Sequence, residues 1–270
     1  MPRDPDDPSL PGWLLYRFVH VPWNALRERN ADFLLYLLLG GRVSGGPFAG
    51  LRYVGNSPNP HIGPALLGTY EMELRPFLQR LLAQDFDVFV DIGAAEGYYA
   101  VGWARFGRAP RVIAYEGDRL GRVLTRFMAR RNGVAGKLDM RGFCDPAALA
   151  EVLAPFQRPV LLVDIEGLEA TMLDPALNPH LARTTLLVEL HEHELAMGDL
   201  LRPRFASTHT IEEAWSTPRT GEDLPRRTGL ARWLFSRDRL LQFADETRGQ
   251  KMRWWLLTPK ASPARPAAQG

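Results

Sequence analysis

Short apolar runs alternate with helical stretches between residues 88 and 191, and this order constrains the fold of the 270-residue chain more than any other feature. It predicts β-α-β units, in which parallel strands form one sheet and helices cover both faces. The runs that begin at residues 88, 160 and 185 are rich in Val and Leu, so we expect them at the buried centre of the sheet. The five runs are Val88–Asp91, Arg111–Tyr115, Leu138–Gly142, Val160–Asp164 and Thr185–His191.

Two further strands are expected after this alternation, over Phe205–Trp215 and Met252–Leu257. The segment between them, residues 216–250, contains a helical pattern around Leu230 to Thr247 and is a candidate substrate cap. A helix with one apolar face is expected from about Glu71 to Ala83, ahead of the first strand.

The chain outside this domain, which we place at residues 66–260, has a different character. Residues 12–65 begin with helically spaced apolar residues that are interrupted near Pro22, and a stretch rich in Gly and Pro follows. We expect a helical N-terminal extension and a linker, with cover over a substrate and contact in a homodimer as open roles. Residues 1–11 and 261–270 are rich in Pro, Ala, Asp and Gly and are expected to be disordered tails.

Charge and cysteine content narrow the classes of function. The formal net charge is only +2, so binding to nucleic acid phosphates is not indicated. Cys144 is the only cysteine, which excludes an internal disulfide framework and a cysteine zinc cluster. The N-terminus lacks the basic start of a secretory signal, and the most apolar stretch, Phe33 to Leu39, is too short to span a membrane. We therefore expect a cytoplasmic protein.

The first predicted strand leads into the turn Asp91-Ile92-Gly93-Ala94-Ala95-Glu96-Gly97, and a helix follows. Glycines permit a tight turn close to a ligand, and free amides at a helix N-terminus can hold a carboxylate. The turn is therefore typical of a nucleotide-cofactor site. Asp91 would repel a pyrophosphate but suits a ligand that bears an ammonium and a sulfonium group. Ala95 stands where the dinucleotide fingerprint has its second glycine, which argues against NAD.

Residues after the second and third strands complete the expected cofactor site. Glu116 follows the second strand at a spacing suited to the ribose hydroxyls. Residues 143–145 follow the third strand, where the adenine would lie, although Cys144 could equally be an ordinary small buried residue. The expected cofactor contacts are Asp91, Gly93, Ala95, Glu96, Gly97, Tyr98, Glu116, Gly117, Asp118, Phe143, Cys144, Asp145 and Asp164.

Together these residues resemble the class I S-adenosylmethionine-dependent methyltransferases, and further runs resemble the FkbM-type family within that class. Val163 to Glu169 is similar to the acidic run that follows the fourth strand in that family. Leu187 to His191 is similar to the family's Glu and His at the end of the fifth strand, and Gly68 to Glu71 is similar to a segment ahead of its first strand. The resemblance covers about residues 66–258. It implies a Rossmann-like α/β fold with about seven mostly parallel strands and a reversed final hairpin. It also implies S-adenosyl-L-methionine as cofactor and methyl transfer most often to oxygen, with a sugar or another small molecule as acceptor.

Candidate catalytic residues lie at the end of the fifth strand. Glu189 and His191 are two residues apart, so both point to the same face at the carboxyl edge, where ligands bind in such sheets. His191 is the first candidate base for an acceptor hydroxyl, because its ordinary pKa lies near neutrality. A solvated histidine at a strand exit is an alternative of equal weight. Glu71 could close over the methionine part of the cofactor or simply interact with the helix dipole.

A metal site is the alternative to a histidine base. Asp164, Glu189, His191 and His209 could bind a divalent ion such as Mg²⁺ that acidifies the acceptor hydroxyl. The zinc-protease motif is excluded, because it needs a second His four residues after the first and Leu195 occupies that position. Two other functions stay open, namely an NAD-dependent oxidoreductase and a non-catalytic scaffold that keeps the cofactor fold.

Overall fold

The computed structural model describes residues 23–55, 62–191, 196–226, 228–246, 248 and 251–260, with side chains from residue 31 onward. Both expected tails, the helix break near Pro22 and residues 192–195 lie outside the described residues. Within the described part of the chain, no helix is both long and apolar enough to cross a bilayer.

Seven strands form one sheet in the order β3-β2-β1-β4-β5-β7-β6. The five strands from β3 to β5 pair in parallel, whereas β7 runs antiparallel to both β5 and β6. This is a Rossmann-like α/β fold with a mostly parallel sheet, and the predicted strands lie at the sheet centre. The strands are β1 (Val88–Ile92), β2 (Val112–Tyr115), β3 (Leu138–Arg141), β4 (Pro159–Val163), β5 (Thr185–Leu190), β6 (His209–Trp215) and β7 (Arg253–Pro259).

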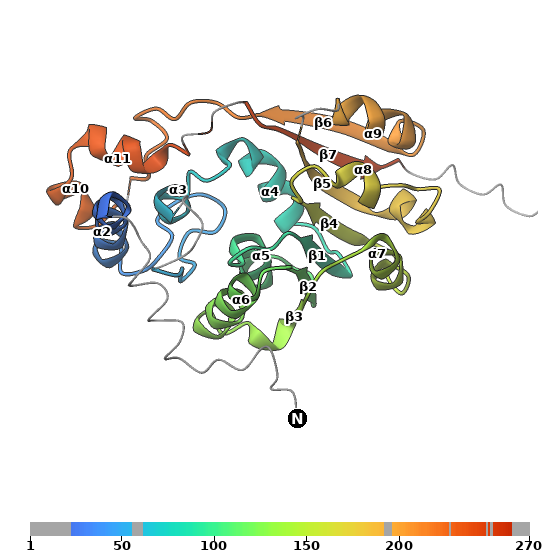
Figure 1. The fold of residues 1–270 in the computed structure, drawn as a ribbon, viewed down its shortest axis with the longest axis horizontal. Helices are drawn as coiled ribbons and strands as arrows, with labels where there is room; N and C mark the ends of the chain where they lie inside the picture. Colours follow the sequence, from blue (N-terminus) through green and yellow to red (C-terminus); the bar gives the residue numbers. More distant parts are fainter. Residues whose placement is uncertain are drawn as a thin grey trace, which may run out of the picture.

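Helices cover both faces of the sheet (Figure 1). Because side chains alternate along a strand, Phe89 of β1 packs with the α4, α5 and α6 layer, while Val88 and Val90 pack with the α7, α8 and α9 layer. Each layer thus has a core of its own. The helices are α4 (Arg75–Leu82), α5 (Tyr98–Phe106), α6 (Arg119–Arg131), α7 (Pro146–Leu153), α8 (Glu169–Met172) and α9 (Met197–Phe205).

Two crossover helices begin at aspartate caps that sit beside the carboxyl edge. The carboxylate of Asp118 accepts the amide of Gly121 at 2.9 Å and starts α6. Asp145 accepts the amide of Ala148 at 2.8 Å and starts α7. A capping carboxylate satisfies an amide that the helix itself cannot, and it favours the positive end of the helix dipole. The sequence after β2 and β3 therefore turns sharply into a helix, which leaves the strand ends open.

The N-terminal helices and the predicted cap pack against each other beside the sheet (Figure 1). A Cβ added to Gly63 would lie 2.5 Å from the carbonyl oxygen of Phe243, and the Thr69 hydroxyl donates to the carbonyl of Ala244 at 3.0 Å. The single helix expected around residues 230–247 is two helices, because Ser236 caps a new helix after a break at Phe235. The elements are α2 (Trp23–Leu38), α3 (Ile62–Leu67), α10 (Ala231–Leu234) and α11 (Arg237–Ala244).

Much of the stretch expected to be a linker, residues 40–64, belongs to the core within its described residues 40–55 and 62–64. Val43, Phe48 and Tyr53 are buried, and the Phe48 ring packs edge-on against Tyr98 of α5 with 5.2 Å between centroids. Gly46 and Gly50, which both have positive φ, shape the turn that contains Phe48. The sequence carries no periodic pattern here, so local reasoning could not predict the packing.

Candidate active site

The turn after β1 is shaped by two glycines. Gly93 has a φ of 91°, and a Cβ added to it would lie 1.8 Å from the carbonyl oxygen of Asp164 at the end of β4. Gly97, the N-cap of α5, has a φ of 93°, and its Cβ would lie 2.7 Å from Cγ2 of Thr125 on α6. Only glycine combines this conformation with such close contacts. The turn therefore joins β1, β4 and α5 at the carboxyl edge of the sheet.

Glu116, directly after β2, is held against this turn. Its Oε2 accepts the amide of Ala95 at 2.7 Å, and its Oε1 accepts the amide of Asp118 at 2.6 Å. The space beside Gly117 is open, because no described atom lies within 4 Å of a Cβ built there. The structure thus brings the expected ribose ligand to the glycine turn, whereas Asp118 is occupied as a helix cap.

Asp91 is buried beneath the turn. It is 1% exposed, and neither carboxylate oxygen accepts a hydrogen bond of normal geometry from the described residues. Burial, and then the charge of Glu116, raise the pKa of Asp91 to about 8, against a smaller opposing contribution from the Ala100 amide. A buried carboxylate without partners is costly, so this position suits a ligand group that carries positive charge.

The side chains of Glu96 and Tyr98 are committed to contacts within the protein. The Tyr53 hydroxyl donates to Oε1 of Glu96, and both partners are buried. The Tyr98 ring packs edge-on against Tyr70, with 5.4 Å between centroids. The predicted contact of these two residues with a cofactor is therefore limited to their backbone.

The loop after β3 offers one exposed ring. Phe143 is 75% exposed, so its face can take a stacked partner. Cys144 is buried, which raises the pKa of its thiol to about 12, and Asp145 caps α7. Phe143 is therefore the member of this trio that remains a candidate for adenine, and the other two have structural roles.

His191 follows β5 and lies among four carboxylates. Its Nδ1 is 2.7 Å from Oε1 of Glu169. Its Nε2 is 3.5 Å from Glu166, 3.7 Å from Asp164 and 3.8 Å from Glu189. Burial lowers the pKa of His191, but the hydrogen bond to Glu169 and the charges of the neighbouring acids outweigh burial and raise it. The alternation of side chains along β5 thus places Glu189 and His191 on one face, as predicted.

Three acids crowd the space beside His191. Glu71, Asp164 and Glu189 offer carboxylate oxygens that all lie within 4.8 Å of one another. Burial is the largest cause that raises the pKa of each to about 8, and repulsion between them adds to it. The predicted catalytic acids therefore form one cluster with the end of β4, in a setting that favours a positive charge.

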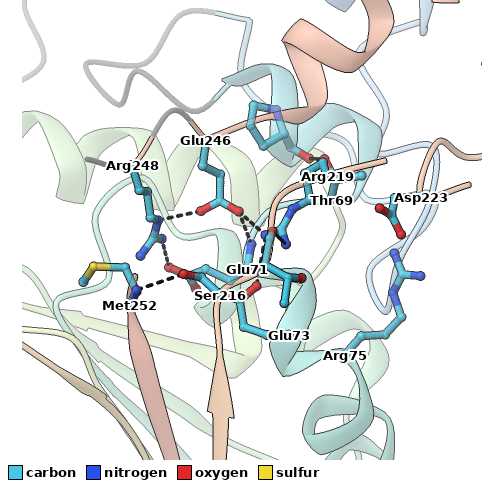
Figure 2. Close-up of polar contacts among 12 residues, drawn as sticks. Thr69, Glu71, Glu73, Arg75, Ser216, Arg219, Asp223, Glu246, Arg248 and Met252 are labelled. Atoms are coloured by element: carbon cyan, nitrogen blue, oxygen red, sulfur yellow. Dashed lines mark hydrogen bonds and ion pairs between the residues drawn. The ribbon is translucent and has the colours of Figure 1, made fainter. Parts of the chain in front are cut away.

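Arg248, which follows α11, supplies such a charge (Figure 2). It donates from Nη2 to Glu71 at 2.6 Å, from Nη1 to Glu189 at 2.6 Å and from Nε to Glu246 at 2.7 Å. Because these acids come from three separate segments, one guanidinium ties the predicted cap to both β5 and the chain before α4.

A second arginine extends this connection. Arg219 is nearly buried and forms ion pairs with Glu73 at 3.0 Å and with Glu246. Glu246 also accepts the backbone amide of Glu71 at 2.8 Å (Figure 2). The predicted cap is thus attached to the site by hydrogen-bonded ion pairs that are shielded from water.

Backbone strain is concentrated at the same edge. Glu71, Ala95 and Glu166 are the non-glycine residues with left-handed φ in the described chain, with values of 43°, 47° and 54°. Such conformations cost free energy and tend to persist at functional sites. Glu71 is not within a regular helix as expected, because it precedes a short 3₁₀ turn at Met72–Leu74 that leads into α4.

The prediction that His209 binds a metal with the other residues is wrong. His209 begins β6, with Nε2 3.0 Å from the carbonyl oxygen of Thr184 and Nδ1 2.8 Å from the hydroxyl of Thr208. Thr184 directly precedes β5, so His209 lies at the amino end of that strand, away from His191 at its carboxyl end. The expected strand began at Phe205, but α9 extends to that residue and β6 begins later.

Sequence reasoning missed several partners of the predicted residues. Glu166 and Glu169 lie within the acidic run, Val163 to Glu169, on which the family resemblance partly rests. The sequence therefore singled out this run, but it did not predict the contact of either residue with His191. Arg248 gave no signal, because it lies 177 residues from Glu71 and 59 residues from Glu189 along the chain.

No family model and no curated protein sequence matches the chain. Solved structures do resemble it. Sp1610 of Streptococcus pneumoniae, a candidate tRNA (m1A22) methyltransferase, is 14% identical over 70% of this chain and 72% of its own, with a TM-score of 0.45. Its complex with S-adenosyl-L-methionine matches over 71% and 74%, also at 0.45. A candidate O-methyltransferase from Klebsiella pneumoniae is 10% identical over 92% and 95%, with a TM-score of 0.40. Likenesses this distant concern the fold, and the FkbM-type resemblance rests on the sequence runs.

Proposed function

We propose that this protein is an S-adenosylmethionine-dependent methyltransferase that acts on a hydroxyl oxygen of a small molecule or sugar, with His191 as general base. The observation that carries the proposal is the position of Asp164. Its carbonyl oxygen lies against Gly93, and its carboxylate is 3.7 Å from Nε2 of His191. One residue thus links the expected cofactor turn to the expected base, at the edge where open α/β sheets bind ligands.

The residues around the turn fit a cationic nucleoside better than a dinucleotide. Asp91 is a buried carboxylate without a good hydrogen bond, so an ammonium or sulfonium nearby would relieve its cost. Glu116 holds two acceptor oxygens beside the turn for ribose hydroxyls. A pyrophosphate would instead add negative charge next to these acids, which disfavours NAD.

The reaction needs orientation and a route for one proton. S-adenosylmethionine supplies an electrophilic methyl group, and its transfer leaves a neutral thioether. The acceptor oxygen forms the new O–C bond while the S–C bond electrons go to sulfur, and the hydroxyl proton passes to Nε2 of His191. Asp164 and Glu189, which face Nε2 within 3.8 Å, would stabilise the imidazolium that forms.

Two observations favour a neutral hydroxyl acceptor. The resemblance of residues 163–169 and 187–191 to the FkbM-type family favours transfer to oxygen. The carboxylates around His191 would repel a phosphorylated or carboxylated acceptor, since like charges in contact cost several kcal/mol. A small hydroxylated molecule such as a neutral sugar meets both conditions.

A divalent metal ion is the second candidate for activating the hydroxyl. Asp164, Glu166 and His191 offer ligand atoms within 4.8 Å of one another. Carboxylate oxygens with one imidazole suit Mg²⁺ or Mn²⁺. The two candidates differ in one measurement: a chelator leaves turnover unchanged if His191 acts alone, and it abolishes turnover reversibly if the ion is required.

Titration calorimetry with S-adenosylmethionine, S-adenosylhomocysteine and NAD tests the cofactor. We expect micromolar binding of the first two and no binding of NAD. Binding of NAD alone would replace the proposal with an oxidoreductase, and binding of none of the three would favour a non-catalytic scaffold.

Substitution of His191 tests the base. His191→Asn should lower turnover of a hydroxylated acceptor by about 10²- to 10⁴-fold, because a positioned base contributes about that much. Affinity for S-adenosylhomocysteine should be unchanged. His209→Asn is the matched control, since His209 lies at the other end of β5. Full turnover in His191→Asn would remove this residue from the mechanism.

A further inference from the structure

Glu169, the first residue of α8, is a fully buried carboxylate that the reaction above does not use. Its Oε1 accepts the amide of Gly167 at 3.1 Å and lies 2.7 Å from Nδ1 of His191. Its Oε2 is buried with no hydrogen-bond partner among the described residues. Complete burial of a carboxylate is costly. The hydrogen bond from the Gly167 amide does not by itself require a carboxylate at position 169, because any small polar side chain can accept from an amide.

The contacts of Glu169 determine which nitrogen of His191 carries the proton. Because Oε1 already accepts the amide of Gly167, this oxygen is an acceptor toward His191 as well. A proton on Glu169 itself would sit on Oε2, so this conclusion holds in either ionisation state. A neutral imidazole has one donor and one acceptor nitrogen. His191 therefore carries its proton on Nδ1 and its lone pair on Nε2.

The lone pair on Nε2 is directed toward the carboxyl edge. Nε2 lies 3.5 Å from Glu166 and 3.7 Å from Asp164, and Asp164 is also the residue whose carbonyl meets the glycine turn. An acceptor hydroxyl placed next to the cofactor would therefore meet Nε2, whereas Nδ1 is turned into the interior toward Glu169.

We propose that Glu169 is a positioning residue for the base. It holds the His191 ring in one orientation and keeps the tautomer in which Nε2 can take the acceptor's proton. The inference rests on the proposed function for the identity of that proton, but the tautomer does not depend on it. Without an acceptor at Oε1 the ring can rotate or exchange tautomers, and Nε2 then presents an N–H to the acceptor.

Two substitutions separate the acceptor oxygen of Glu169 from its charge. Glu169→Gln keeps an oxygen for Gly167 and His191 and removes the charge. Glu169→Met removes the oxygen at similar volume. Each variant is compared with the wild type in turnover, in affinity for S-adenosylhomocysteine and in long-range ¹H–¹⁵N NMR spectra of histidine side chains, which distinguish the two tautomers. The chain has six histidines, so the His191 signal is assigned by its loss in His191→Asn.

The wild type and Glu169→Gln should show His191 protonated on Nδ1, recorded at a pH where the ring is neutral. Glu169→Met should lose this pattern and lose about 10²-fold or more in kcat, with KM and S-adenosylhomocysteine affinity nearly unchanged. Glu169→Gln should lose no more than about tenfold, since it removes the charge alone.

Three results would overturn the inference: a wild type protonated on Nε2, a Glu169→Met variant with an unchanged tautomer, or a Glu169→Met variant with unchanged kcat. The first requires no variant, so the test remains valid if Glu169→Met does not fold. Absence of methyl transfer by the wild type contradicts the proposed function instead, and the NMR spectra then still decide the tautomer.

Discussion

The two sides of the candidate site are built in different ways. The side proposed for the cofactor consists of one continuous turn between β1 and α5, in which Gly93 and Gly97 set the backbone conformation and Glu116 accepts the amide of Ala95. The side proposed for the acceptor consists of side chains from separate segments, with His191 and Arg248 surrounded by acids. The first side depends on backbone shape and the second on the balance of charge. Substitutions should therefore lower stability through steric clashes on the first side and through unbalanced charge on the second side.

Gly93→Ala should have the largest effect on the backbone-built side. Its Cβ would clash with the carbonyl oxygen of Asp164, in a conformation that L residues rarely adopt. We expect a loss of about 3 kcal/mol or more in the free energy of unfolding, measured by urea denaturation. Gly117→Ala is the matched control, because nothing described lies near its Cβ, and it should change stability by less than about 0.5 kcal/mol. Equal stability of the two variants would contradict the difference between the two sides.

Arg248→Met should have the largest effect on the charge-built side. It leaves Glu71, Glu189 and Glu246 without their shared cation, and an uncompensated buried charge is strongly destabilising. We expect a loss of about 2 kcal/mol in the free energy of unfolding. Arg80→Met removes the exposed pair with Glu212 and should cost no more than about 0.5 kcal/mol. If both substitutions cost the same, the Arg248 contacts add nothing beyond a surface ion pair.

Asp91→Asn sharpens the comparison, because Asp91 is a buried carboxyl group on the backbone-built side. Its pKa of about 8 in the fold exceeds the value of about 3.9 in an unfolded chain. The folded state therefore holds an extra proton between these values, and stability falls as pH rises through that window. Without cofactor, Asp91→Asn should gain stability relative to the wild type as pH rises from 4 to 8, by several kcal/mol at pH 8, because each unit of pKa difference corresponds to about 1.4 kcal/mol.

The same substitution should weaken binding of S-adenosylmethionine, which calorimetry measures. Asp145→Asn, which changes an exposed helix cap, serves as the control for both measurements. A stability difference that is equal at pH 5 and pH 8 would mean that Asp91 is not protonated in the fold.

Ala95→Gly should have the smallest effect and the opposite sign. Ala95 has a left-handed φ of 47°, which costs an L residue roughly 1–2 kcal/mol and costs glycine almost nothing. We expect a gain of about 1 kcal/mol in the free energy of unfolding, with cofactor affinity retained. A loss of stability on this substitution would show that the turn is not under strain.

The difference between the two sides also explains what the sequence could predict. Local patterns predict β1, the glycine turn after it and the role of Glu116, since each depends on residues that are close along the chain. Glu189 and His191 were placed on one face by alternation along a single strand. The contact of Glu169 with His191 depends on how the loop after β4 packs against the end of β5. The contacts of Arg248 with Glu71 and Glu189 depend on a segment that is distant from both along the chain. Such contacts leave no periodic signal.

The errors have the same origin. His209 was included as a possible imidazole ligand from its residue type, and its position beside the amino end of β5 depends on how distant segments pair in the sheet. Residues 40–64 were expected to form a linker or loop because they are rich in Gly and Pro, and the burial of Phe48 and Tyr53 leaves no regular spacing in the sequence.

The position of β7 has a consequence for the order in which the protein is made. Although β7 follows β6 along the chain, it lies between β5 and β6 in the sheet, and its Trp254 pairs with Glu189. Until a ribosome has released residues 253–259, β5 keeps an open edge and β6 has no partner in the sheet. The side of the site that contains His191 and Arg248 is therefore completed only after residues 253–259 have been synthesised, so a nascent chain can form the glycine turn well before it can complete this side.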